Sequence, residues 1–523
     1  MTDQRRDDDD GSDFDSALDA LDAGQLRALV RELLLSLDEV DGARLMSEVV
    51  DCAARASNGW SPRAPSEHRV EEIESFVDAA RRVHMADPSE VDDYLLEGTR
   101  AFLARNYPAA VRIFGALLRP IGDGDIHLGQ DELVDEVLGV DVHACAMQYL
   151  VAVYMTTSPP DRSHAVHAAI EDIYGVSSYF QPLRELEEVA VEPLPDFEDF
   201  LVLWRALVEE RFAAAPARHR GYREDRWLRE VVSRTEGADG LAEIARQSRR
   251  PDDLQAWCRE LVKARDWTAA RAACEEAAEL LEGHGGSRGD FLDGAALAAR
   301  ELGSTDFEQT LERAWREAPS LGRLCRVLGG SATRDELAAR AGSALEVVPA
   351  AAARQRALLH IVRGELDAAA VLLASAPGLG WSSAEHPGSL AFPLFVALLG
   401  GGEIAIEPPH SYADWSGLMD NDGPRLETPT VDALLRLADL RAPKDDALRS
   451  SMVAAMRRAV EQRALGVTSN KRRGQYRHVA SLALQCARAD GSPQGRAWLG
   501  DLMARFRRYP ALQREFKAAG GRG

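Results

Sequence analysis

The chain contains 523 residues, which is too many for one ordinary compact core and indicates either several domains or one extended array. Hydrophobic residues make up 46% of the sequence, enough to build packed cores, so a chain disordered throughout is excluded. The formal net charge of −23 argues against a general nucleic-acid coat protein, because a strongly acidic surface repels a polyanion.

Residues 1–20 form an acidic tail with four consecutive aspartates and little apolar content, so we expect this tail to be disordered. Residues 21–65 follow as an N-terminal helical hairpin and a linker that contains a glycine and two prolines. Apolar residues at helical spacing mark the two helices of the hairpin. These stripe residues are Leu26, Leu29, Val30, Leu33 and Leu34 in the first helix and Leu45, Met46, Val49 and Val50 in the second.

Residues 66–216 are predicted to form a first helical array that contains a tetratricopeptide-like unit. Asn106 marks the turn of this unit, and Pro108 stands at the start of its second helix, where a missing N–H costs nothing. We expect Pro120 to end that helix. The small and aromatic marker residues of the unit are Tyr94, Gly98, Ala101, Tyr107, Ala110 and Phe114. The array is predicted to continue with a helix pair over 130–154 and with single helices over 162–174 and 197–215.

Residues 217–399 are predicted to form a second helical array, and its clearest element is a hairpin over 251–283. Apolar residues at the spacing of one helical face mark its first helix, and a turn follows around Arg265 and Asp266. Trp267 begins the second helix, which carries a stripe of alanines where the two helices touch. The apolar residues are Leu254, Trp257, Cys258 and Leu261, and the alanines are Ala269, Ala270, Ala273 and Ala277. The same turn recurs in the stretch RGELDAAAVLL.

Residues 400–429 are predicted to be an irregular insertion, in which only the stretch EIAIE favours a short strand. Residues 430–523 return to helical periodicity and are predicted to form a basic C-terminal helical block. A hairpin cannot bury its apolar face alone and needs neighbours to stack on. The sequence therefore predicts an all-α protein, an irregular tetratricopeptide-like α-solenoid of stacked helical hairpins.

Three stretches together resemble a known family. The similar segments are YPAAVRIFGALLRPI with the sequence that follows it, the hairpin over 251–283 with the basic segment before it, and TSNKRRGQYRHVASLALQCARADGSPQGRAWLGDLMARFRRYPALQREFKAA. They are similar to the long helical region that follows the zinc finger in bacterial SWIM zinc finger proteins. The finger itself needs a C-x-C pair and a C-x-H pair, and the chain contains neither. The resemblance therefore implies the helical scaffold and carries over neither zinc nor the finger's nucleic-acid contacts.

Two motifs suggest chemistry at first sight. The stretch GGSRG matches the G-x-S-x-G pattern of a nucleophile elbow, but an elbow needs a strand before its serine. Helical periodicity precedes the motif here, so we interpret it as a flexible connection between helices. The stretch DGDIHLGQDE is similar to a calcium loop, but Leu128 replaces the required glycine and Val134 replaces the final glutamate. We interpret this stretch as a solvated acidic turn.

The six cysteines form no C-x-C or C-x-x-C pair, which is typical of reduced cysteines in a cytosolic protein. His143 and Cys145 precede His164 and His167, and these side chains would offer zinc ligands if their helices packed together. The spacing matches no established metal motif, so we interpret them as ordinary helix residues. We therefore predict no catalytic residue, no metal and no cofactor.

The distribution of charge is uneven. Residues from Arg441 to Gly523 include 18 lysines and arginines but only 6 acidic residues, a net charge of +12, which leaves −35 for the rest of the chain. Three basic clusters are candidate contacts for a partner protein or for nucleic acid. The candidates are Arg220, Arg223 and Arg226 in the first cluster, Lys471, Arg472, Arg473 and Arg477 in the second, and Arg505, Arg507 and Arg508 in the third. Solvated helix faces and attraction to the acidic part of the chain are the alternative interpretations.

The prediction for function is a non-enzymatic scaffold that binds other proteins, since stacked hairpins present extended surfaces. The alternative is an accessory subunit of a nucleic-acid-processing or defence system that acts through the basic C-terminal block, and a less favoured one is an enzyme with its site near the 400–429 insertion. The N-terminus is polar, and the longest nearly uncharged apolar run, Leu390 to Leu399, is too short to span a bilayer. We therefore expect a cytoplasmic protein without a membrane anchor, whose partner the sequence does not name.

Overall fold

The computed structural model describes residues 20–37, 39–56, 60–129, 134–177, 181–214, 223–283, 285–383, 385–400 and 424–520. Throughout this part of the chain the regular elements are helices, and the β-type pairing in it is an isolated bridge between Met85 and His127. The all-α prediction is confirmed. The acidic tail, the EIAIE stretch and most of the 400–429 insertion lie outside the described residues.

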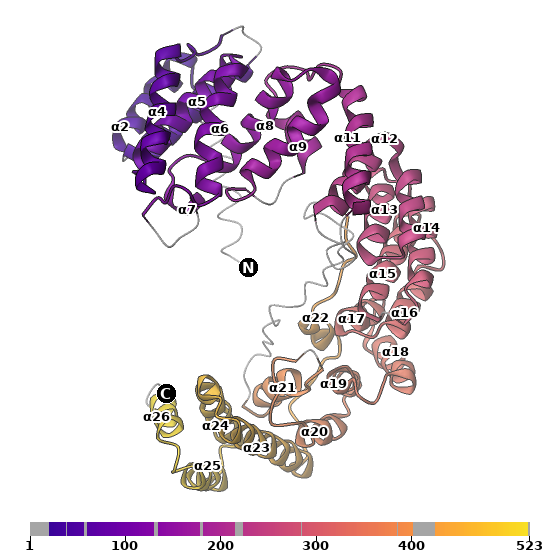
Figure 1. Ribbon diagram of the computed structural model, residues 1–523. Coiled ribbons are helices and arrows are strands. Elements are labelled where there is room, and N and C mark those ends of the chain that lie inside the picture. The colour runs from indigo at the N-terminus through magenta and orange to yellow at the C-terminus, as the bar shows by residue number, and fades with distance from the viewer. Residues whose placement is uncertain are drawn as a thin grey trace. The chain divides into compact units, whose positions relative to one another are not determined.

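The chain divides into two compact units, Met1–Glu236 and Gly237–Gly523. Helix α12 (Arg223–Ser248) contains the boundary, and Gly237 interrupts it with the non-helical angles φ 60° and ψ −143°. Figure 1 shows that each unit is a succession of helices. The finer division into six segments remains a prediction.

The first unit, called unit 1 below, packs each helix mainly against its neighbours in the sequence, with α5 on α6, α6 on α8 and α8 on α9. Its helices are α2 (Ala23–Ser36), α3 (Glu39–Arg55), α4 (Glu67–Val83), α5 (Pro88–Leu103), α6 (Tyr107–Gly122), α7 (Val134–Val137), α8 (Val142–Thr156), the short 3₁₀ helix η1 (Pro159–Asp161), α9 (Arg162–Ile173), α10 (Pro182–Val189), α11 (Phe197–Ala214) and the first part of α12.

The tetratricopeptide-like unit predicted in the sequence is the pair α5 and α6. Asn106 caps α6 by accepting a hydrogen bond from the backbone N–H of Ala109, and Pro108 lies in the first turn of the helix. Gly98 permits the close approach of the two helices, because a Cβ atom there would lie 2.6 Å from a ring carbon of Phe114. This part of the prediction is confirmed.

Two details of unit 1 differ from the sequence prediction. Pro120 does not end α6, which continues to Gly122, since a proline near the end of a helix removes a single backbone hydrogen bond. The helix pair expected over 130–154 corresponds to α7 and α8, and residues 130–133 lie outside the described part of the chain. Helix α10, which has Pro182 in its first turn, was missed because its pattern is only eight residues long.

The second unit, called unit 2 below, extends from the end of α12 through fourteen further described α-helices. They are α13 (Pro251–Lys263), α14 (Trp267–Leu280), α15 (Gly285–Glu301), α16 (Phe307–Glu317), α17 (Leu321–Gly329), α18 (Arg334–Val347), α19 (Ala353–Val362), α20 (Leu366–Ala374), α21 (Gly388–Gly400), α22 (Val431–Leu437), α23 (Asp446–Ser469), α24 (Tyr476–Asp490), α25 (Pro493–Arg505) and α26 (Pro510–Gly520), with the 3₁₀ helix η3 (Arg473–Gln475) before α24.

The hairpin predicted over 251–283 is the pair α13 and α14. Arg265 adopts the left-handed conformation at the turn, with φ 56°, and Asp266 caps α14. Trp257 and Ala270 are buried, as the pattern indicated, and Ala270 packs with Val262 and with Ala298 of α15. The alanine stripe therefore joins α14 to helices on both sides.

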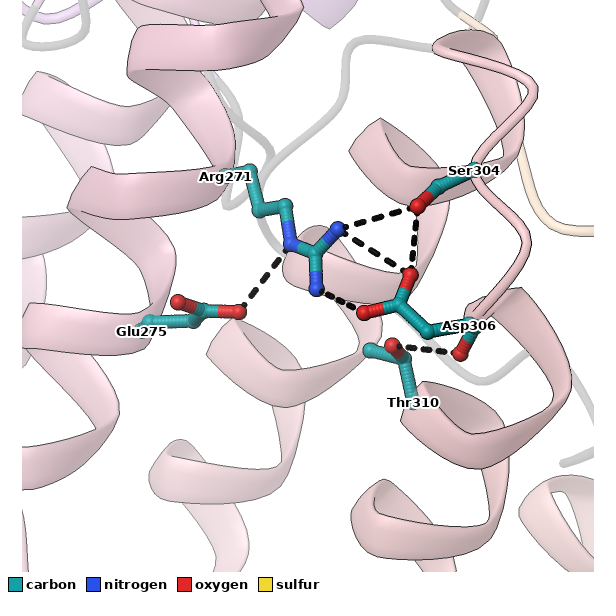
Figure 2. Close-up of polar contacts among 5 residues, drawn as sticks. All are labelled: Arg271, Glu275, Ser304, Asp306 and Thr310. Atoms are coloured by element: carbon teal, nitrogen blue, oxygen red, sulfur yellow. Dashed lines mark hydrogen bonds and ion pairs between the residues drawn. The ribbon is translucent and has the colours of Figure 1, made fainter.

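A polar network ties this hairpin to the next helix pair, as Figure 2 shows. Arg271 of α14 donates hydrogen bonds to both carboxylate oxygens of Asp306, at 3.2 and 2.6 Å, and a third to Glu275 at 3.1 Å. Ser304 donates a hydrogen bond to the same Asp306 carboxylate. Arg271, followed by Ser304, lowers the pKa of Asp306 to about 2, so this aspartate remains charged under ordinary conditions.

The C-terminal block belongs to the core of unit 2. One continuous cluster of buried side chains extends from Trp315 of α16 to Phe516 of α26 and includes residues of α19, α20, α21, α23 and α24. Helix α23 packs against α20 and α21 within this cluster. The block is therefore attached to unit 2 by apolar packing.

The GGSRG motif does not form the flexible connection that the sequence suggested. Its residues are the first turn of α15, which begins at Gly285. Gly289 is buried in this turn, and a Cβ atom there would lie about 2.4 Å from the guanidinium group of Arg323. The glycine thus gives space to a buried arginine.

Unit 1 contains two neighbouring carboxyl groups that are largely buried. Glu230 of α12 accepts a hydrogen bond of 2.8 Å from the backbone N–H of Arg184 at the start of α10, while Glu185 lies beside it. Burial, followed by the charge of Glu185, raises the pKa of Glu230 to about 7, although the backbone N–H groups of Arg184 and Leu183, and then Arg234, oppose the shift. Desolvation also raises the pKa of Glu185, and Glu188 adds to the rise, while the backbone hydrogen bond from Gln181, and then His143 and Arg184, oppose it.

The alanine seam can be tested with Ala270→Arg. Because Ala270 is fully buried, the larger and charged side chain should lower the free energy of unfolding by about 3 kcal/mol or more. Ala272→Arg is the matched control, since Ala272 is exposed on the same helix. Chemical denaturation measures both variants. Equal stability of the two would show that α14 does not pack as described.

The Glu230 site gives a pH-dependent prediction. A raised pKa keeps the folded state protonated after the unfolded chain has ionised, so stability falls as pH increases from about 4.5 to about 7. Glu230→Gln should be more stable than the natural chain by about 1–3 kcal/mol near pH 8 and nearly equal to it near pH 5. Melting temperatures across this range measure the difference. The exposed Glu210→Gln is the control, and a pH-independent difference for Glu230→Gln would contradict the assignment.

Candidate interaction surface

The structure gives the predicted basic residues two different surroundings. Arg220 lies outside the described residues, whereas Arg223 and Arg226 belong to the first turn of α12 in unit 1. The other candidates belong to the turns that flank α24 and α25 in unit 2.

Arg223 is held within unit 1. It forms an ion pair with Glu171 of α9, and its guanidinium group lies 4.9 Å from the centre of the Trp227 ring and 5.1 Å from that of Tyr174. Trp227 is itself buried against Trp204. An arginine stacked on aromatic rings and paired with a carboxylate stabilises the packing of its own helix. Arg223 is therefore a weaker candidate for partner contact than the sequence suggested, and Arg226 is likewise only partly exposed.

The turn between α23 and α24 presents the second basic cluster. Helix α23 ends at Ser469, and Lys471 takes the left-handed conformation with φ 54°, which reverses the chain. The backbone N–H of Arg472 donates to the carbonyl of Val467 at 2.9 Å, and η3 follows. The side chains of Lys471, Arg472, Arg473 and Arg477 are exposed.

A buried arginine fixes the position of this turn. Arg463 of α23 is only 5% exposed and donates to the side-chain oxygen of Gln475 at 2.8 Å and to the carbonyl of Gly378 at 3.3 Å. Desolvation, and then the nearby charge of Arg472, lowers the pKa of Arg463. The sequence analysis did not distinguish Arg463 from its exposed neighbours. Its helical spacing from the apolar residues of α23 could have indicated that it lies on the buried face.

The turn between α25 and α26 presents the third basic cluster. Arg505, Arg507 and Arg508 are exposed, whereas Phe506 between them is 4% exposed and anchors the turn in the core. Arg508 covers the ring of Tyr509, with its guanidinium carbon 5.2 Å from the ring centre.

The two turns lie at the same end of the last hairpins. Helices α24 and α25 pack together and are joined by only Gly491 and Ser492, a connection typical of antiparallel neighbours. In an antiparallel succession, the turns before the first helix and after the second are at the same end. We call the exposed residues of these two turns the basic end: Lys471, Arg472, Arg473, Arg477, Arg505, Arg507 and Arg508.

The basic end differs from the other arginine-rich parts of the chain. Elsewhere in the described residues many arginines pair with carboxylates, as Arg246 does with Glu276 and Arg340 with Glu308. Within the described residues, none of the seven side chains of the basic end forms an ion pair. Unpaired guanidinium groups can bind carboxylates or phosphates through two parallel hydrogen bonds.

A second cluster of charges was not found from the sequence. Asp293 of α15 is buried between Arg323 and Arg326 of α17, at 2.9 Å from each. Arg326 also donates to the hydroxyl of Thr428 at 2.8 Å, which attaches the segment before α22 to α17. The sequence does contain a sign of this cluster, because two arginines three residues apart interrupt an otherwise apolar helix. This cluster is structural, since its charges are paired and buried.

The suggested metal ligands do not meet in unit 1. Cys145 is buried with its sulfur 3.9 Å from the hydroxyl oxygen of Thr99, while His143 contacts Ser177. His164 is exposed, and His167 packs against the rings of Trp204 and Trp227. Burial raises the pKa of the Cys145 thiol to about 12. Within the described ranges, no three His, Cys, Asp or Glu side chains are grouped closely enough to hold a metal ion.

In the part of the chain that the structure describes, no helix has the length and apolar character needed to cross a membrane. The chain matches no family model, and searches of curated proteins and of solved structures found no similar protein. The likeness to SWIM-associated helical regions therefore remains an expectation from the sequence.

Proposed function

We propose that the protein is a non-enzymatic scaffold that binds an acidic surface of a partner protein through the basic end. The observation that carries this proposal is the set of seven exposed cations that have no carboxylate partner among the described residues, in a chain of net charge −23. A cationic patch of this kind raises the rate of encounter with an acidic partner and selects against basic ones. The C-terminal helical block packs against the rest of unit 2 through buried apolar side chains, and this packing supports a basic end of fixed position within that unit.

Side-chain burial favours a protein partner over single-stranded nucleic acid. Proteins that bind single strands stack bases on exposed aromatic rings. Near the basic end, Tyr476 and Phe506 are both 4% exposed, and Arg508 covers the face of Tyr509. The described part of the patch thus offers charge with little aromatic stacking surface, and the acidic remainder of the chain repels a polyanion.

The proposal of a non-enzymatic role rests on the surroundings of the reactive groups. Cys145 and Cys486 are buried, and burial raises the pKa of each thiol to about 12, which suppresses the nucleophilic thiolate. Ser287 of the GGSRG motif belongs to the first turn of a helix and lacks the strand of a nucleophile elbow. The alternative function, an accessory subunit of a nucleic-acid-processing or defence system, would use the same basic end.

A three-alanine variant of Lys471, Arg472 and Arg473 tests the proposal. Proteins captured from the native host by the natural chain, after nuclease treatment, should be lost with this variant, because the cations that hold the acidic surface are gone. A second variant with Arg27, Arg31 and Arg334 changed to alanine removes the same charge from exposed positions elsewhere and should retain them. Mass spectrometry of the captured proteins measures the outcome.

Oligonucleotide binding distinguishes the alternative. The proposal predicts no measurable complex with single- or double-stranded DNA near physiological salt, as followed by fluorescence anisotropy. Tight binding with a steep dependence on salt, abolished by the three-alanine variant, would overturn the protein-partner proposal and support a nucleic-acid role.

A further inference from the structure

A buried histidine in unit 2 lies beside the loop that supports the basic end. His386 is 3% exposed and comes just before α21, and its ring packs against that of Trp381 with 5.0 Å between the ring centres. Both ring nitrogens form hydrogen bonds to backbone groups, one to the carbonyl of Pro377 and one to the N–H of Gly388. A histidine held in this way responds to a change in its protonation.

The two hydrogen bonds fix the charge of the ring. A backbone N–H can only donate, so Nδ1 accepts the bond of 3.0 Å from Gly388 and carries no proton. A carbonyl oxygen can only accept, so Nε2 carries the proton and donates the bond of 2.9 Å to Pro377. His386 is therefore neutral in the folded structure.

Protonation of Nδ1 is incompatible with this geometry. A proton taken up from solvent at Nδ1 would point at the N–H of Gly388, so that two donors would face each other. The ring has little space to turn, since a Cβ atom on Gly388 would lie 2.8 Å from the ring carbon Cε1 of His386 and 3.0 Å from the ring of Trp381. A charged ring must therefore leave this position, and its hydrogen bond to Pro377 is lost with it.

The surroundings of His386 also disfavour a positive charge. Burial lowers the pKa of His386 from its ordinary value of 6.5, and the carbonyl of Pro377 opposes this shift. The positive charges of Arg463 on α23 and then of Arg354 on α19 lower the pKa further. The fold thus holds the neutral ring between two cationic helices.

Two other titratable groups lie nearby. His478 of α24 packs against the other side chain of this site, Trp381, with 5.5 Å between the ring centres, and is exposed. Glu385 precedes His386 in the chain, and its carboxylate accepts a hydrogen bond of 3.4 Å from Gln355 of α19. Among the described residues, the charges that act on the His386 ring are therefore those of the two arginines.

The loop after α20 connects His386 to the basic end. Pro377 accepts the hydrogen bond from His386, and the next residue, Gly378, accepts one of 3.3 Å from Arg463. Gly378 lies tightly against α23, because a Cβ atom on it would overlap a backbone carbonyl of that helix. Arg463 also donates to Gln475 in the turn between α23 and α24. Two successive backbone carbonyls therefore join the histidine to the arginine that positions this turn.

From these contacts we propose that protonation of His386 frees the turn between α23 and α24 from its fixed position, so that acidification changes the shape of the basic end. The charged ring leaves Pro377, the loop separates from α23, and Arg463 loses one of the two groups that hold it. Release of the turn depends only on these contacts, whereas an effect on partner binding rests on the function proposed above.

Amide hydrogen exchange of the full-length chain tests the proposal, because it reports on each segment separately. The reporters are the amides of Arg472 and Gln475, which donate to the carbonyls of Val467 and Arg472 within the turn. The unfolded chain binds a proton at His386 more readily than the folded chain does, so stability falls as pH decreases below about 6.5. After correction for intrinsic exchange rates, protection of these amides should fall by about fivefold or more between about pH 7.5 and about pH 5.

Three variants separate His386 from the other groups. His386→Gln keeps a donor for Pro377 and cannot be charged, so its turn should stay protected at both pH values. Arg463→Met breaks the connection, so the turn should exchange rapidly at both pH values while the loop at 377–378 still responds to pH. His478→Gln is the matched control and should respond as the natural chain does, since this histidine is exposed.

Equal protection of the turn at the two pH values in the natural chain would overturn the inference. A pH response that persists in His386→Gln, or that disappears in His478→Gln, would also overturn it. If His386→Gln does not fold, as circular dichroism would show, the natural chain and the other two variants still decide the outcome. Failure of the basic end to bind an acidic partner would refute the proposed function and leave the exchange result unchanged.

Discussion

Close contact between helices at small residues is the constraint on which both units depend. Ala270 meets Ala298 at the seam between α14 and α15, and Gly98 lies directly against the ring of Phe114 between α5 and α6. Each hairpin leaves one apolar face uncovered, and the next hairpin covers it. Because the helices touch closely at these small residues, whether a substitution there is tolerated depends more on the size of the new side chain than on its polarity.

The helices that could be predicted from the sequence are those with strong local sequence patterns. The alanine stripe and the Asp266 cap determined the hairpin at α13 and α14 from a few residues, and Asn106 determined the start of α6 in the same way. Short elements such as α7 and α10 carry too few turns for periodicity to define them. Pro120 was misread because the cost of a proline depends on how near it lies to the end of its helix.

The basic residues of the candidate surface could be identified from the sequence, but which of them are exposed could not. The sequence identified Lys471 and Arg508 as basic and gave Arg223 the same status. Only tertiary structure shows that Arg223 stacks on Trp227 while the other two remain exposed. A pocket lined by Gln148 and Asp51 in unit 1 was not predicted, because these residues are distant in sequence and come together only when their helices pack.

The predominance of contacts between successive helices also bears on how the chain acquires its structure during synthesis. Unit 1 ends at Glu236 and forms a compact unit of its own. Low separation between contacting elements favours rapid folding. Unit 1 can therefore reach its native packing while the ribosome is still translating unit 2, which shortens the exposure of unfinished apolar faces to aggregation.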